Sequence, residues 1–279
     1  MTRAPAFAIV LLLLSGCSAT QWLYNSMDWL AYTRIDDRFA ITDAQQSRVE
    51  ELIAGAHRWH RRTQLPAYAN TLEQMAERYA DGLSRADVNW IADRIEMHRR
   101  AAVEELVPRA APFLADLDST QVAHFRRRGL ERIEEAAEPL SLDPEKRLNE
   151  RVDSVEEQLE RWLGDLSSGQ LDFLRTRLAD LPDFRARWIA HRRVRLEEMT
   201  QLLATAPDAA AIEAGLLHWW VDLDVGYTPD YARARADAWQ RFFTLMVEFD
   251  SLVTTTQRSQ AVETLRRYAA EFRGLSRDD

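Results

Sequence analysis

Leu166-Ser167-Ser168-Gly169-Gln170 is one of five copies of a short pattern that decides the fold of this chain. In each copy an apolar residue precedes a capping residue, and a polar acceptor follows three positions later. The other copies are Ile41-Thr42-Asp43-Ala44-Gln45, Leu83-Ser84-Arg85-Ala86-Asp87, Leu117-Asp118-Ser119-Thr120-Gln121 and Val253-Thr254-Thr255-Thr256-Gln257. This is the pattern of a capping box, in which the cap oxygen accepts an exposed helix N–H and the later side chain reaches back to the cap N–H. We therefore expect a helix to begin at each copy.

Outside these starts, apolar residues recur at helical spacing, and glycine and proline fall mostly between the periodic segments. The sequence predicts an all-α fold of about ten helices in a helical-hairpin or bundle array, with no significant β-sheet. Pro108 and Pro112 are expected to interrupt or end a helix. The predicted helices span residues 20–34, 42–62, 66–81, 84–107, 118–137, 143–163, 167–180, 182–205, 207–221, 228–251 and 254–273.

Leu14-Ser15-Gly16-Cys17 near the N-terminus resembles the lipobox of a bacterial lipoprotein signal. Arg3 supplies a positive n-region and residues 6–14 an apolar h-region, too short for a membrane-spanning helix. The resemblance implies removal of residues 1–16 and attachment of up to three acyl chains, palmitate among them, to Cys17, the sole cysteine. Ser18 in the next position favours the outer membrane, with retention in the inner membrane as the alternative.

The remaining residues, 17–279, are predicted to form one periplasmic domain, and a boundary between two halves would fall near 138–144. Removing residues 1–16, which hold one arginine and no acid, changes the formal charge from −9 to −9 − 1 = −10. Such an acidic body argues against nucleic acid as a partner. The aromatic-rich stretch from Trp22 to Tyr32 either contacts lipid headgroups or forms the first core helix.

Two family resemblances follow from these motifs. The five cap patterns are similar to the Leu-Thr-x-x-Gln signature of the Spy and CpxP group, which are helical, cradle-shaped periplasmic chaperones or sensors. The stretches Asp28-Trp29-Leu30, Asp36 to Gln45 and Trp59 to Tyr68 resemble an uncharacterised family of proteobacterial lipoproteins. The second resemblance implies fold and location but no activity.

A second repeated motif, His-Arg-Arg, begins at His60, His98 and His191. Each histidine follows a large apolar residue by seven positions, which places it at the border of an apolar stripe. The strongest candidate for binding an anion or a protein partner is the turn that contains Arg58, His60, Arg61 and Arg62. The alternative is structural: the histidines border the core and the arginines pair with nearby acids.

The segment from His218 to Pro229 is the second candidate, because its aromatic and acidic residues suit a groove for peptide or sugar. Its candidate residues are Trp219, Trp220, Asp222, Asp224 and Tyr227. The alternative is that the tryptophans belong to the core. The spacing predicts no metal site and no cofactor, and no catalytic motif is present.

These observations favour a lipid-anchored periplasmic protein that works by binding, with a chaperone-like or envelope-stress role and unfolded or acidic protein partners. The alternative is a scaffold or accessory subunit of an envelope complex, and an enzyme acting on the cell wall is a more distant third. The partner and the oligomeric state are left open.

The lipobox predicts that Cys17→Ser abolishes lipidation, because the thioether to the acylated glyceryl group forms at this sulfur. Metabolic labelling with an alkyne fatty acid should mark the unsubstituted protein and leave the variant unmarked. Equal labelling of both proteins would contradict the lipoprotein interpretation.

Overall fold

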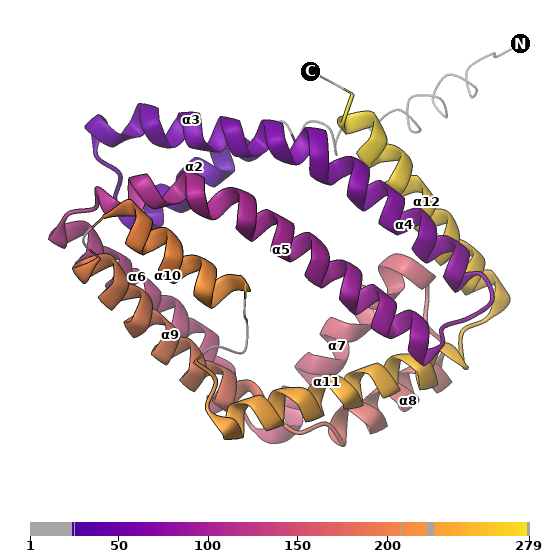
Figure 1. Ribbon diagram of the computed structural model, residues 1–279. Coiled ribbons are helices and arrows are strands. Elements are labelled where there is room, and N and C mark those ends of the chain that lie inside the picture. Colours follow the sequence, from indigo (N-terminus) through magenta and orange to yellow (C-terminus); the bar gives the residue numbers. More distant parts are fainter. Residues whose placement is uncertain (1–23, 25, 207, 222–225, 278–279) are drawn as a thin grey trace, which may run out of the picture.

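The computed structural model describes residues 24, 26–206, 208–221 and 226–277, and this part of the chain is all-α, as predicted. Figure 1 shows the helices laid around a ring that the long α5 crosses. The elements are α2 (Met27–Phe39), α3 (Asp43–Trp59), η1 (His60–Gln64), α4 (Leu65–Tyr79), α5 (Arg85–Ala115), α6 (Ser119–Ala137), η2 (Glu138–Ser141), α7 (Pro144–Leu163), α8 (Ser168–Ala179), α9 (Arg185–Thr205), α10 (Ala209–Val221), α11 (Pro229–Asp250) and α12 (Thr255–Leu275).

Cys17 and the whole predicted signal lie outside the described residues. Among the helices that the structure describes, none is long and apolar enough to cross a membrane.

The two helices predicted at 42–62 and 66–81 form one continuous rod. α3 passes into the π-helical turn η1, in which the Leu65 N–H donates to the His60 carbonyl five residues earlier. Pro66 stands in the first turn of α4. Because proline lacks an N–H and its ring clashes with a carbonyl four residues before it, a wider turn at this point lets the helix continue.

The prediction that Pro108 and Pro112 interrupt a helix is wrong, since α5 continues through both to Ala115. Each proline leaves the carbonyl four residues before it without an N–H donor. Tertiary packing outweighs this loss, because Ala111, Phe113 and Leu114 are buried on the same turns.

Four of the five helix caps meet in pairs through their glutamines. The Gln45 Nε2 donates to Oε1 of Gln121 at 3.2 Å, and the Gln121 Nε2 donates back at 2.8 Å. Gln170 and Gln257 make the same reciprocal pair at 2.9 and 3.2 Å. The predicted boxes are thus joined two by two across 76 and 87 residues of sequence.

Each paired amide has at least two further bonds. Its Oε1 accepts the N–H of its own cap residue, at 2.9–3.2 Å. Its Nε2 donates to the carbonyl two residues before the partner's cap; these carbonyls belong to Asp116, Ala40, Leu252 and Asp165. A glutamine amide offers two N–H donors and two acceptor positions, so every one of them is used.

The individual caps differ in detail. Ser167 accepts the Gln170 N–H at 3.3 Å, as predicted. Thr42 keeps the box arrangement, but its hydroxyl makes no cap hydrogen bond of normal geometry. The copy at Ser84 ends in Asp87, whose carboxylate has no N–H and cannot form an amide pair; it accepts from Arg78 instead, at 3.1 Å. Hydrogen bonds from Ser84 and then Arg78 lower the pKa of Asp87.

The helix contacts repeat in two halves, joined at η2. In the first half α2 packs on α3 and α6, and in the second α7 packs on α8 and α12. Each half also packs one helix on the other half: α4 of the first half lies along α12, and α9 of the second half lies along α6. The core around Gln45 and Gln121 therefore combines residues of both halves, such as Phe39 and Phe125 with Ile212 and Leu216.

The glutamine pairs should be cooperative. We expect Gln257→Leu to lower the free energy of unfolding by about 1–3 kcal/mol, because it leaves the buried Gln170 amide and the Asp165 carbonyl unsatisfied. The double variant Gln170→Leu/Gln257→Leu should lose less than the sum of the single losses. Urea melts measure both quantities, with Gln46→Leu, at an exposed glutamine of α3, as the control. Additive losses would show that the amides do not act as a pair.

Candidate functional site

The predicted basic site coincides with the π-helical turn. π-Turns within α-helices are often found at functional sites. The turn packs on Tyr24, whose hydroxyl lies 3.0 Å from the Nδ1 of His60. The His60 ring also meets Tyr68 edge to face, with 5.5 Å between centroids. Burial, and then the charge of His57, lowers the pKa of His60.

The four predicted residues of this turn do not converge on one point. His60 is half-buried against Tyr24, and the guanidinium of Arg61 lies 5.0 Å above the same tyrosine ring. Arg58 and Arg62 are exposed. His60 and Arg61 therefore hold Tyr24, the first described residue, in place. Binding of an anion or a partner by the turn stays a prediction.

The other two His-Arg-Arg motifs have mainly structural contacts. His98 Nε2 lies 2.8 Å from the Thr71 hydroxyl, and Arg100 pairs with Glu104 at 2.8 Å. Arg99 donates to the carbonyl oxygens of Trp220 and Val221, the last residues of α10.

In the third motif His191 lies between Tyr227 and Tyr231, with centroids 4.7 and 4.3 Å away. Tyr227 of the predicted aromatic groove thus meets the third motif, as Trp220 meets Arg99 of the second motif. Trp219 lies beneath the Arg195 guanidinium at 4.8 Å, whereas Trp220 is 51% exposed. Asp222 and Asp224 lie outside the described residues. The described residues therefore neither form the predicted groove nor exclude it.

A different groove, which the sequence did not predict, lies between α5 and α11. Val88, Ile91 and Ile95 face it from α5, and Trp239, Phe242 and Met246 face it from α11. Its volume is about 1140 Å³. Ile95, Trp239 and Phe242 are exposed by 64%, 46% and 41%. We call this feature the α5–α11 groove.

Hydrogen bonds join the two helices at one end of the groove. Arg85 of α5 donates to the side chain of Gln240 and, at 3.3 Å, to the hydroxyl of Thr244. Next to them Asp250, which is buried, accepts the Leu83 N–H at 2.8 Å and pairs with Arg258 at 2.9 Å. These bonds hold the turn before α5 against the end of α11.

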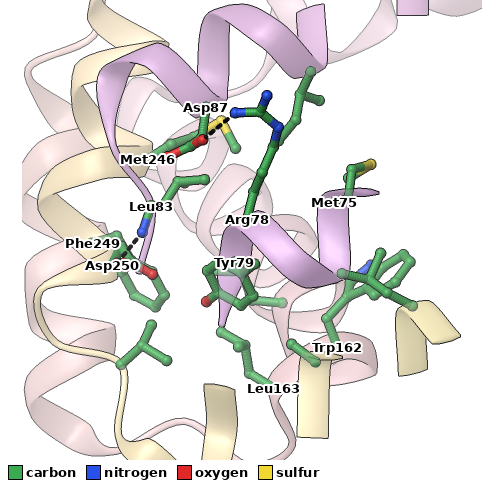
Figure 2. A pocket seen from close by; sticks show the side chains of 15 residues that line it. Met75, Arg78, Tyr79, Leu83, Asp87, Trp162, Leu163, Met246, Phe249 and Asp250 are labelled. Atoms are coloured by element: carbon green, nitrogen blue, oxygen red, sulfur yellow. Dashed lines mark hydrogen bonds and ion pairs between the residues drawn. The ribbon is translucent and has the colours of Figure 1, made fainter. Parts of the chain in front are cut away.

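A smaller apolar pocket continues from the closed end of the groove. Figure 2 shows Met75 and Tyr79 of α4, Leu163 of α7 and Phe249 of α11 around it. Ile91 and Met246 line both the groove and this α4–α11 pocket, so the two are continuous. Burial, and then Asp250, raises the pKa of the Tyr79 hydroxyl, which stays protonated.

A signal for the groove was present in the sequence without being decisive. Trp239, Phe242, Phe243 and Met246 follow helical spacing and form an apolar stripe. A stripe of this kind is identical in pattern to one that faces a core. Only the tertiary structure shows that none of the described helices covers it.

Comparison with known proteins gives the class of the chain but no activity. A model of a family of unknown function, DUF6279, matches residues 37–246. The chain therefore belongs to this family, and the match runs through both halves of the fold, from α2 into α11. No curated protein and no solved structure shows significant similarity to it.

The buried histidines predict a loss of stability in mild acid. Burial lowers the pKa of His60, so the folded chain keeps it neutral, while the unfolded chain takes up a proton near pH 6.5. The unfolded state then binds more protons, and the free energy of unfolding falls as the pH drops below about 6.5. The pKa shifts of His98 and His191 have the same direction.

The test compares melting temperatures at pH 7.5 and 5.5. His60→Gln should reduce the difference between them, because it removes one of the groups that must stay neutral. The control is His218→Gln, at an exposed histidine, which should leave the difference unchanged. An equal acid sensitivity of His60→Gln and the unsubstituted chain would exclude this cause.

Proposed function

We propose that this protein is a lipid-anchored periplasmic binding protein with a chaperone-like role, which holds apolar segments of incompletely folded polypeptides in the α5–α11 groove. One observation carries the proposal: the facing sides of α5 and α11, both with large apolar side chains, line an open groove. Contiguous exposed apolar surface of this kind marks interaction sites in soluble proteins.

The chemistry of the groove suits many clients rather than one. Trp239 and Phe242 offer broad apolar faces, and Met246 is flexible enough to repack around different side chains. The charges at its rim are of both signs: Asp93 and Glu96 stand near Arg99, Arg100 and Arg235. Apolar contacts that are flanked by charges of both signs do not select a single client sequence. No step of this role requires catalysis.

The proposed anchor would hold the groove near the membrane. Tyr24 is buried against Leu65 and Leu275, so the described fold begins there. Tyr24 stands seven positions after Cys17 in the sequence, and an extended chain spans at most about 3.6 Å per residue. The folded body would then start within about 25 Å of the lipid attached to Cys17, on the periplasmic face of the outer membrane.

The groove should be needed for client capture. The triple variant Ile95→Gln/Trp239→Gln/Phe242→Gln should suppress aggregation of a chemically unfolded test enzyme roughly tenfold less well, which corresponds to about 1.4 kcal/mol of binding free energy. The melting temperature should change little, because these side chains are already exposed.

The matched control is Met97→Gln/Val194→Gln/Leu252→Gln, three exposed apolar residues outside the groove. It should retain full suppression. Equal activity of the two triple variants would contradict the proposal. Crosslinking in intact cells that captures one protein at fixed stoichiometry would instead favour the alternative role as a scaffold or accessory subunit of an envelope complex.

A further inference from the structure

The α4–α11 pocket has an unusual lining for a recess of its size. Apart from the charged groups at its edges, its walls are the side chains of apolar and aromatic residues, among them Leu159, Leu163, Phe249 and Leu265. The polar groups at those edges already have partners: Arg78 pairs with Asp87, and Asp250 with Arg258. Water needs two to four polar partners to occupy a buried site, so this pocket favours an apolar occupant.

The space beside α5 is filled along one part of the helix and open along another. α10 lies along the C-terminal half of α5 (Figure 1), and its Ile212 and Leu216 are almost fully buried. At Gly215 of α10 a Cβ atom would come within 2.8 Å of the Leu202 side chain of α9, so α10 also packs closely on α9. Between α5 and α11 the space is left open by the described residues.

The size of the pocket fits a single hydrocarbon chain. Its volume is about 230 Å³. A methylene group takes up a volume similar to the roughly 30 Å³ of a water molecule, which gives room for about seven or eight carbons. A longer chain would pass Ile91 and Met246 and continue into the α5–α11 groove.

An arginine stands at the edge of the pocket. In Figure 2 the guanidinium of Arg78 points to Asp87, with which it forms an ion pair. The same guanidinium lies 4.6 Å from the centre of the Trp90 ring. A guanidinium has five N–H groups, and the hydrogen bond of Arg78 to Asp87 uses one of them. The remaining N–H groups suit the oxygens of an anionic head group.

We propose that the α4–α11 pocket binds the hydrocarbon chain of a single-chain anionic amphiphile, with the head group at Arg78. A free fatty acid and a lysophospholipid share this chemistry. The site is distinct from the proposed peptide site, although the two share a border at Ile91 and Met246. Each acyl carbon placed in the pocket leaves water, which strengthens binding.

The experiment uses the full chain with Cys17→Ser, so that no acyl group of its own competes. Dansyl-labelled undecanoic acid should bind saturably, with a rise and blue shift of its fluorescence. Decanoate should displace it better than decanol, because decanol lacks the charge that Arg78 meets. Lysophosphatidylglycerol and decanoate, compared as competitors, distinguish the two sources of the acyl chain.

Two variants locate the site. Ala261→Phe, on the buried wall formed by α12, fills the pocket and should weaken probe binding at least tenfold. Arg78→Gln should remove the preference for decanoate over decanol while decanol still binds. If Ala261→Phe does not fold, as judged by circular dichroism, Leu265→Phe serves in its place.

The control Val194→Gln, at an exposed residue outside both the pocket and the groove, should leave probe binding unchanged. The absence of saturable binding, or unchanged affinity in the filled variant, would overturn the proposal. Either result would leave the peptide-binding role of the groove to be judged by its own assay.

Discussion

The reciprocal amide bonds Gln45–Gln121 and Gln170–Gln257 are the interaction on which the rest of the structure depends. Each pair ties two helix starts to each other and to the chain that leads into them. Gln121, Gln170 and Gln257 are buried, where an unsatisfied amide is costly and a fully bonded one specifies a single geometry. The angle and register of α3 against α6, and of α8 against α12, are therefore fixed at their first turns.

α4 of the first half packs on the second half, and α9 of the second half packs on the first. This arrangement forms the proposed binding surfaces. α5 and α11 run between the two pairs and are anchored by the buried Asp250 network at one end of the groove. Where α10 lies along α5 the helices pack closely. Where α11 faces α5 the two helices separate, which exposes Trp239 and Phe242 and opens the pocket behind Met246. The groove and the pocket thus adjoin each other at Ile91 and Met246. The groove suits a peptide, and the pocket suits an acyl chain.

The basic turn has a structural role that can coexist with a binding role. The π-turn accommodates Pro66, and Tyr24 packs against His60 beneath Arg61. This contact fixes the first described residue of the chain, a few residues after the proposed lipid anchor. The turn would therefore lie on the part of the molecule nearest the membrane, while the groove lies between α5 and α11.

The sequence by itself determined the helices and their starts, because capping boxes and apolar periodicity depend on residues within one or two turns of each other. It also raised the candidates at Arg58 to Arg62 and Trp219 to Tyr227, since these are unusual as local composition. Only the tertiary structure decided which glutamines pair, that α5 continues through Pro108 and Pro112, and which apolar stripe is left uncovered. These outcomes depend on contacts between residues 70 or more positions apart, and a buried stripe and an exposed one have the same local pattern.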